Sequence, residues 1–262
     1  MNLGFKDKVV FITGATGGIG KEVVRAFANE GAKLSITSTK QEKIDALVKE
    51  LGLSEEQCLS HVIDVTEEEA VKAAVKHTVD HYGEINVLIN IAGYQGKAAP
   101  ITEQSYDDFM KVYSINVFGP VYAIKAAFPY MEKQGGGSIV TLASDGAFVG
   151  APGMSTYTSS KHAIAGITKS VALEGADKNI RAKYICPGPV DTDMMRRIER
   201  DTLGEDVSVK DAKAAFSAAN PQKRYAKPEE VAALTLFAAS DLINHVTAEG
   251  FRINGGTSAT SR

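Results

Sequence analysis

The chain has 262 residues, of which 44% are hydrophobic and 23% are charged, and its formal net charge at pH 7 is −3. This length and composition predict one soluble α/β domain with a sizeable core. The small net charge, with acidic and basic residues interspersed, argues against a nucleic-acid partner. The sequence has no apolar run long enough for a signal peptide or a membrane span, so we expect a cytoplasmic protein without a membrane partner.

The positions of the cysteines and histidines bear on disulfide bonds and metal binding. Cys58 and Cys186 lie far apart in the sequence, which fits a reducing compartment better than a disulfide framework. His77 and His81 are four residues apart and could face one side of a helix, but neither a third ligand nor an HExxH pattern lies near them. We therefore expect no metal site.

Short β-rich runs alternate with amphipathic helical patterns along the whole chain. Strands are expected at 8–13, 33–37, 59–63, 86–90, 138–142, 181–185 and 250–254. Helices are expected at 20–31, 41–51, 67–83, 105–134, 155–178 and 227–240. This alternation predicts an α/β, doubly wound Rossmann fold, a seven-stranded and mostly parallel sheet with helices on both faces. No linker or repeat interrupts the series, so residues 1–262 are expected to form a single domain.

Residues 191–227 are the exception to this alternation. The segment is polar, bears methionines and has a mostly helical pattern. It follows a late strand, at the carboxyl edge where such sheets bind ligands. We expect a substrate lid here; a surface excursion without function is the alternative.

A glycine-rich turn, "TGATGGIGKE", follows the first predicted strand and opens the first predicted helix. Gly14, Gly18 and Gly20 are spaced by three residues and then by one. Glycines at such a turn let backbone N–H groups approach a pyrophosphate closely, and the helix N-terminus adds a positive dipole end. A dinucleotide site is the prediction.

The end of the second predicted strand bears on which dinucleotide binds. An acidic residue there would bind the ribose hydroxyls of NAD, but Ser38, Thr39 and Lys40 stand in that region instead. Small hydroxyls and a cation suit a 2′-phosphate, so NADP(H) is favoured and NAD(H) remains possible. Asp64, after the third strand, is placed to accept a hydrogen bond from the adenine amino group.

Tyr157 and Lys161 lie four residues apart in "STYTSSKHAIAG". Positions with this spacing are neighbours on one face of an α-helix. The spacing alone also fits an ordinary helix surface, so its meaning depends on the other motifs.

Together these motifs resemble the short-chain dehydrogenase/reductase family, over essentially the whole chain. The resemblance rests on the TGxxxGxG turn, "NIAG" (90–93), "PGPVDT" (187–192) and the YxxxK unit. It implies a catalytic tetrad of Asn116 in "SINVFG", Ser144 in "LASDG", Tyr157 and Lys161.

The resemblance also implies a role for each member of the tetrad. Tyr157 exchanges a proton with the substrate oxygen while hydride moves, and Ser144 orients that oxygen. Lys161 holds the nicotinamide ribose and, with the positive nicotinamide ring, lowers the pKa of Tyr157. Asn116 anchors a water that connects Lys161 to solvent.

The expected cofactor contacts are spread along the chain. They are Gly14, Thr16, Gly18, Ile19, Gly20, Ser38, Thr39, Lys40, Asp64, Val65, Asn90, Ala92, Gly93, Tyr157, Lys161, Pro187, Gly188, Val190 and Thr192. The chain departs from the family pattern at Asn86, Ile91, Thr141 and Lys183. None of these departures removes a catalytic group.

The expected activity is an NADP(H)-dependent interconversion of a secondary alcohol and a ketone. An apolar rim around 145–154, with Met194 and Met195 opposite, favours a hydrophobic substrate such as a hydroxysteroid or bile acid. Alternatives are reduction of a 3-oxoacyl thioester, with Arg196, Arg197 and Arg200 facing an acidic carrier, or a non-catalytic NADP(H)-sensing protein. An esterase is disfavoured because no G-x-S-x-G elbow surrounds Ser144. The resemblance implies that the helices at 105–133 and 155–175 pair across subunits, giving a homotetramer or homodimer.

Overall fold

The computed structural model describes residues 2–259 and contains one seven-stranded sheet. The strands are β1 (Val9–Thr13), β2 (Lys33–Ser38), β3 (Cys58–Val62), β4 (Val87–Asn90), β5 (Gly137–Leu142), β6 (Ile180–Pro187) and β7 (Gly250–Ile253). Their order is β3-β2-β1-β4-β5-β6-β7, and every neighbouring pair is parallel. The doubly wound Rossmann fold is confirmed, with a sheet that is wholly rather than mostly parallel.

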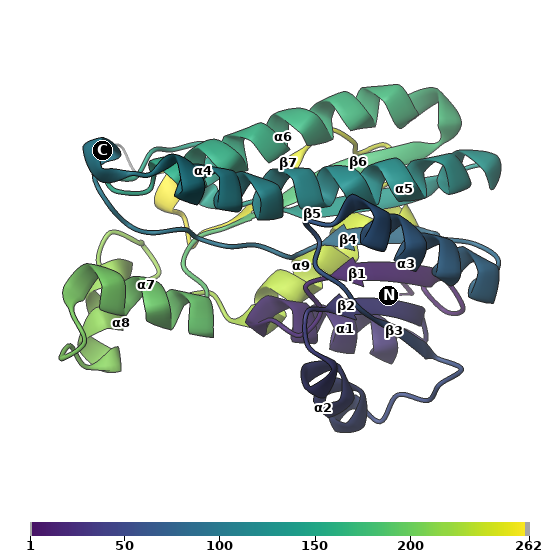
Figure 1. The fold of residues 1–262 in the computed structure, drawn as a ribbon, viewed down its shortest axis with the longest axis horizontal. Coiled ribbons are helices and arrows are strands. Elements are labelled where there is room, and N and C mark those ends of the chain that lie inside the picture. Colours follow the sequence, from purple (N-terminus) through teal and green to yellow (C-terminus); the bar gives the residue numbers. More distant parts are fainter. Residues whose placement is uncertain (1, 260–262) are drawn as a thin grey trace.

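Helices cover both faces of this sheet (Figure 1). They are α1 (Gly18–Asn29), α2 (Gln41–Leu51), α3 (Glu68–Tyr82), α4 (Tyr106–Tyr113), α5 (Gly119–Lys133), α6 (Ser155–Gly175), α7 (Asp193–Leu203), α8 (Val209–Ser217) and α9 (Pro228–Ala239). One core contains side chains of α1, α2 and α9, and a second contains side chains of α3, α5 and α6.

The alternation of side chains along the strands produces these two cores. In β1, Val10 and Ile12 face the α1 and α9 side, whereas Phe11 between them faces α3 and α5. All five residues of β1 are buried, which explains why the strand reads as one continuous apolar run.

The single helix expected at 105–134 is interrupted, which corrects the sequence prediction. A π-helical turn, Ser114–Phe118, separates α4 from α5. Pro120 stands in the first turn of α5 and has no backbone N–H, so an α-helical hydrogen bond to the carbonyl of Asn116 cannot form. The interruption falls at one of the expected tetrad residues.

Lys183 is fully buried in β6, beneath α9. Its Nζ atom donates a hydrogen bond of 2.8 Å to the carbonyl oxygen of Ala238, in the last turn of α9. Burial, together with the nearby charge of Arg181, lowers the pKa of Lys183 to about 8. This departure from the family pattern therefore has a structural role at the end of a helix.

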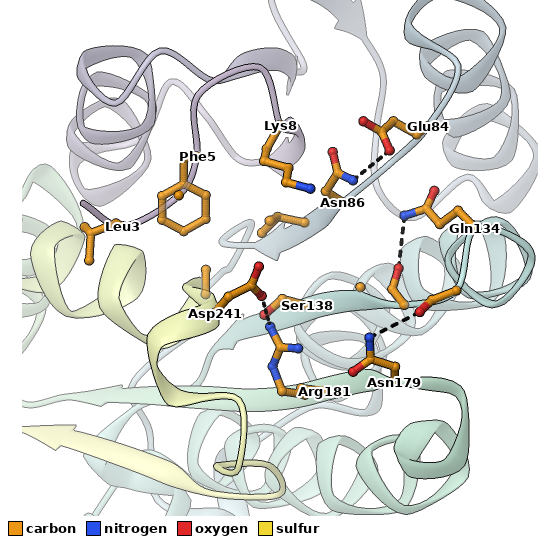
Figure 2. A pocket seen from close by; sticks show the side chains of 16 residues that line it. Leu3, Phe5, Lys8, Glu84, Asn86, Gln134, Ser138, Asn179, Arg181 and Asp241 are labelled. Atoms are coloured by element: carbon orange, nitrogen blue, oxygen red, sulfur yellow. Dashed lines mark hydrogen bonds and ion pairs between the residues drawn. The ribbon is translucent and has the colours of Figure 1, made fainter. Parts of the chain in front are cut away.

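A polar cavity of about 220 Å³ lies at the amino-terminal edge of the sheet (Figure 2). Among the residues that line it, Lys8 and Asn86 immediately precede β1 and β4, and Ser138 and Arg181 are the second residues of β5 and β6. The sequence motifs follow the last residues of the strands. This cavity is therefore at the opposite edge from the expected cofactor site.

Within residues 2–259, no helix combines the length and the apolar character needed to cross a membrane.

Candidate functional site

Three loops at the carboxyl edge of the sheet meet around the glycine turn. Gly14 has φ +68°, and a Cβ atom built on it would stand 2.6 Å from the backbone nitrogen of Ala92, in the loop after β4. A Cβ atom on Gly18 would stand 2.7 Å from Cγ2 of Thr192, in the loop after β6. The chain segments are thus close enough that only glycine fits at these two positions.

The glycine turn also exposes the start of α1. A Cβ atom at Gly20 would collide with the carbonyl oxygen of Gly14, so the turn depends on glycine there as well. The helix begins at Gly18, and its N-cap residue, Gly17, offers no side chain to cap it. Donors at the first turn of the helix are therefore directed at the space where the motif predicts a pyrophosphate.

The residues expected around the adenosine ribose lie at the end of β2. Oγ1 of Thr16 and Oγ of Ser38 are 2.7 Å apart and hydrogen bonded, which joins the glycine turn to β2. Thr39 and Lys40 follow and are exposed, and Lys40 makes an ion pair of 3.9 Å with Glu42. A cation is therefore available beside the small hydroxyls, as the sequence predicted.

The residues expected around the adenine lie one strand further on. Asp64 is exposed, and its Oδ1 accepts hydrogen bonds of 2.9 and 2.8 Å from the backbone and the hydroxyl of Thr66. Val65 is buried against Gly119. The carboxylate of Asp64 is thus held in place by its own loop.

The end of β4 contains a buried polar group without a partner. Asn90 is 1% exposed, and its Oδ1 atom has no hydrogen-bond partner among the described residues. The Nδ2 atom of Asn90 lies 3.5 Å from the hydroxyl of Thr141. Position 141 is one of those at which this chain departs from the pattern of the family it resembles. Buried acceptors of this kind are rare in folded proteins and indicate a missing donor.

The loops after β4 and β6 complete the set of expected cofactor contacts. Gly93 lies beside the tetrad, since a Cβ atom built on it would be 3.6 Å from Oδ1 of Asn116 and 3.8 Å from Nζ of Lys161. Pro187 ends β6, and Gly188 packs against Asn254. Ile19 packs against the core beneath the turn, and Val190 is buried within that core.

Asn116 lies in the π-helical turn and its side chain is bonded at both ends. Oδ1 accepts a hydrogen bond of 2.7 Å from the backbone N–H of Tyr94, and Nδ2 donates to the carbonyl of Tyr94 at 2.8 Å. Nδ2 also donates to Oγ of Ser160 at 3.0 Å. These bonds join the loop after β4 to α6, in which Tyr157 and Lys161 lie.

Ser144 and Tyr157 meet across the end of β5. Ser144 has an extended backbone, caps the short 3₁₀ turn Asp145–Ala147 and accepts a hydrogen bond of 3.2 Å from Gly146. A Cβ atom built on Gly146 would be 3.5 Å from Oγ of Ser144 and 3.8 Å from Cε1 of Tyr157, so the serine hydroxyl and the tyrosine ring border the same space. The two hydroxyls can therefore contact one substrate oxygen together.

Lys161 lies one helical turn after Tyr157. Its Nζ atom is 5.5 Å from the centre of the Tyr157 ring and donates a hydrogen bond of 2.9 Å to the carbonyl oxygen of Leu142. The structure thus brings all four expected tetrad residues to one place.

Burial governs the pKa values of this pair. It raises the pKa of the Tyr157 hydroxyl above its ordinary value, and the nearby side chain of Ser144 offsets part of the effect. Burial also lowers the pKa of Lys161, from 10.5 to about 8. In the protein without its cofactor, burial thus raises the pKa of Tyr157, and a lowered pKa in the presence of the positive nicotinamide ring stays a prediction.

The structure shows contacts of Tyr94 and Asp145, two residues of the expected pocket walls, that sequence reasoning did not give. The backbone N–H and carbonyl of Tyr94 are hydrogen bonded to the side chain of Asn116. The centre of the Tyr94 ring lies 4.8 Å from Nζ of Lys111 and 5.1 Å from Cζ of Arg197. Asp145 is hydrogen bonded to Asn254. No motif marks these contacts, since they join positions far apart in the sequence through backbone atoms or exposed side chains.

Residues 191–227 form α7 and α8 and the segments that flank them (Figure 1). Arg196 is paired with Asp191 at 3.3 Å and with Glu199 at 2.6 Å, so its charge is already neutralised. Met194 is partly exposed, whereas Met195 is buried. Of the two methionines expected at the substrate, Met194 is therefore the exposed one.

These features fit a dinucleotide. The glycines let three loops meet closely at the start of α1, whose first turn supplies donors, and Asn90 has a buried acceptor without a partner among the described residues. Thr16, Ser38 and Lys40 could hold the adenosine end, and Lys161 could hold the nicotinamide ribose.

Comparison with known proteins agrees with this geometry. The family model for short chain dehydrogenases matches residues 8–203. A 3-oxoacyl-[acyl-carrier-protein] reductase FabG of Thermotoga maritima is 36% identical, and the match covers 96% of this chain and 98% of the relative. A levodione reductase of Leifsonia aquatica is 34% identical, with 97% of this chain and 96% of the relative covered.

Solved structures give the same result. A crystal structure of levodione reductase superimposes with a TM-score of 0.94 at 34% identity and covers 98% of this chain and 100% of that one. ElxO with NADP bound and a xylitol dehydrogenase with NAD⁺ bound superimpose with TM-scores of 0.89 and 0.88, at 31% and 34% identity, each covering 97% of this chain and 100% of the other. Because the family model covers residues 8–203 and these relatives share the fold at 31–36% identity over nearly the whole chain, the chain belongs to the short-chain dehydrogenase/reductase family of oxidoreductases acting on CH–OH groups.

Proposed function

We propose that this enzyme interconverts a secondary alcohol and a ketone with NADP(H), and that its substrate is hydrophobic, of the hydroxysteroid or bile-acid kind. The observation that supports the chemistry best is the grouping of Tyr157, Ser144 and Lys161. The centre of the Tyr157 ring lies 5.5 Å from Nζ of Lys161, and Ser144 is near enough to lower the pKa of the phenol.

Each tetrad residue then has a defined task. Ser144 holds the substrate oxygen, and Tyr157 gives a proton to that oxygen in reduction or takes one in oxidation. Bound NADP(H) supplies the hydride in reduction and a positive ring in oxidation. Because burial raises the pKa of Tyr157 in the protein alone, the phenol is kept protonated and ready to donate.

Lys161 and Asn116 assist proton transfer at Tyr157. With a pKa of about 8, Lys161 is still mostly protonated at neutral pH, so its ammonium can hold ribose hydroxyls and stabilise a phenolate. Asn116 lies beside Lys161 next to Gly93 and is placed to hold the water that connects the lysine with solvent.

We propose NADP(H) rather than NAD(H) because of the residues at the end of β2. Ser38 is hydrogen bonded to Thr16, and Lys40 is exposed beside them, a set that favours a 2′-phosphate. Asp64, exposed at the next strand, would accept the adenine amino group.

The proposed substrate class rests on the apolar rim. Phe148 and Val149 are 37% and 39% exposed, and Met194 of α7 is 36% exposed. Large apolar side chains exposed in the loop that follows Ser144 and on α7 favour an apolar ligand over a sugar. We propose residues 191–227 as the lid over that ligand.

Reduction of a 3-oxoacyl thioester is the second candidate. The similarity to the reductase FabG favours it. The expected arginine cluster supports it less well, since Arg196 is paired with two carboxylates and Arg197 contacts the ring of Tyr94. Arg200 is exposed.

We also propose a homotetramer or homodimer in the cytoplasm. A groove between α5 and α6 is lined mainly by apolar residues, among them Val121, Phe128 and Ile167. Apolar helix faces of this kind are buried when subunits pair. Both cysteines are free thiols, which suits a reducing compartment.

The test is to titrate NADPH and NADH separately and then to screen ketosteroids, oxo bile acids, acetoacetyl thioesters and small diketones for cofactor oxidation. Tight NADPH binding with turnover of the apolar ketones supports the proposal. Turnover of the thioester alone favours the second candidate. NADPH binding without turnover of any ketone would leave the non-catalytic NADP(H)-sensing protein.

A further inference from the structure

Asp145 directly follows Ser144 and is bonded to a distant part of the chain. Its Oδ1 atom accepts a hydrogen bond of 2.9 Å from Nδ2 of Asn254, 109 residues away. Asn254 follows β7, the last strand of the sheet. This contact joins the 3₁₀ turn after Ser144 to the edge of the sheet.

The orientation of the Asn254 amide is fixed by a second contact. Its Oδ1 atom accepts a hydrogen bond of 3.2 Å from the backbone N–H of Gly256, so the NH₂ group must face Asp145. The residue is 7% exposed. A buried amide bonded at both ends has little freedom to leave the carboxylate.

The backbone of Asn254 is bonded to the proposed lid. Its carbonyl oxygen accepts a hydrogen bond of 3.1 Å from Nδ2 of Asn220, which follows α8 within residues 191–227. Asn220 is itself buried, and its Oδ1 atom accepts a hydrogen bond of 2.8 Å from the backbone of Gln222. Asn254 is therefore in contact with both the loop of Ser144 and the lid segment.

We propose that Asn254 is a positioning residue for Ser144, and that it links the placement of this serine to residues 191–227. The inference rests on the proposed catalytic role of Ser144. Ser144 caps the turn that Asp145 begins, so a shift of Asp145 moves the serine hydroxyl relative to Tyr157. A misplacement of about 1 Å in such a constellation costs roughly 100-fold in rate.

The variant Asn254→Asp tests the contact at nearly constant size. Two carboxylates then face each other, and one must stay protonated for the bond to survive. We expect kcat near the wild-type value at low pH and a fall of at least tenfold, relative to wild type, as the pH rises and both carboxylates ionise. The KM for NADPH should not change. Cys186 and Arg252 lie nearby, and burial raises the pKa of the Cys186 thiol to about 12, so this thiol does not titrate in the range tested.

The double variant Asn254→Asp with Asp145→Asn reverses the bond. One amide again faces one carboxylate, so we expect the wild-type pH profile of kcat to return. Asn244→Asp, at an exposed position near the end of α9, is the matched control for the added charge. Asp145→Ala is the second measurement, and it should lower kcat about tenfold without weakening NADPH binding, even if Asn254→Asp does not fold.

The possible results separate this inference from the proposed function. If Ser144→Ala keeps full kcat, the catalytic role of Ser144 is wrong, and the inference falls with it. If Ser144→Ala is slow but Asn254→Asp and Asp145→Ala both follow the wild type at every pH, only the inference is wrong. A double variant no better than Asn254→Asp alone would also contradict it.

Discussion

Lys161 donates a hydrogen bond of 2.9 Å from its Nζ atom to the carbonyl oxygen of Leu142, the last residue of β5. The lysine is 4% exposed, and burial lowers its pKa from 10.5 to about 8. One hydrogen bond to a neutral acceptor replaces only part of the hydration energy that an ammonium group loses on burial. The functional cation therefore costs the folded protein stability.

We predict that Lys161→Met removes turnover yet leaves the cofactor-free protein at least as stable at pH 7. Between pH 8 and 10.5, unfolded Lys161 still holds a proton that the folded protein has released, so raising the pH favours the wild-type fold. Between pH 7.5 and 9.5, the free energy of unfolding of the wild type should rise by about 2 kcal/mol relative to that of the variant. Urea unfolding of both proteins at the two pH values measures this. A difference that stays constant with pH contradicts the lowered pKa.

Gly20→Ala should weaken dinucleotide binding. Its Cβ atom would collide with the carbonyl oxygen of Gly14, so the turn must open and its N–H groups move. We expect at least a tenfold weaker NADPH affinity and a loss of about 1–3 kcal/mol in stability. Gly166→Ala, in open space on α6, is the control and should bind NADPH as the wild type does. Equal affinities for both variants would show that the turn does not hold the cofactor.

Lys40→Ala should weaken NADPH about tenfold and leave NADH unchanged. A charge-assisted hydrogen bond from an exposed lysine to the 2′-phosphate is worth roughly that factor. Lys43→Ala, an exposed lysine in the first turn of α2, controls for the loss of charge. Isothermal titration with both cofactors gives the answer. A similar loss of affinity for NADH, or no loss of affinity for NADPH, would show that Lys40 does not bind the 2′-phosphate.

Val121→Glu should disrupt the assembly. Val121 lines the groove between α5 and α6, and a buried carboxylate at a subunit contact is costly. Light scattering should give a tetramer or dimer for the wild type and a smaller species for the variant. Leu242→Glu, at an exposed residue that does not line this groove, should assemble normally. A wild type that is monomeric at working concentration overturns the prediction.

The order of strands and helices could be predicted because it depends on local patterns. The strand β1 reads as "VVFIT" because all of it is buried, and the glycines of "TGATGGIG" are required by contacts within a few ångströms of the turn. YxxxK needs only the geometry of one helix to place Tyr157 near Lys161, and the ring of Tyr157 indeed lies 5.5 Å from the lysine nitrogen.

The remaining features depend on contacts between distant segments. The π-helical turn at Asn116 combines the missing N–H of Pro120 with a side chain bonded to Tyr94, and the helical periodicity of the segment conceals it. The bond between Asp145 and Asn254 spans 109 residues and has no motif. The pKa of Tyr157 depends on the balance between burial and neighbouring charge, which the spacing of residues cannot give.

The most direct test of the central claim is the variant Tyr157→Phe, measured for NADPH affinity and for kcat with the best ketone of the screen. Loss of the proton donor should lower kcat by two orders of magnitude or more, while NADPH binds as tightly as to the wild type. A variant that still turns over at the wild-type rate would contradict proton transfer by this phenol. A variant that loses cofactor binding as well would assign the hydroxyl a structural role instead.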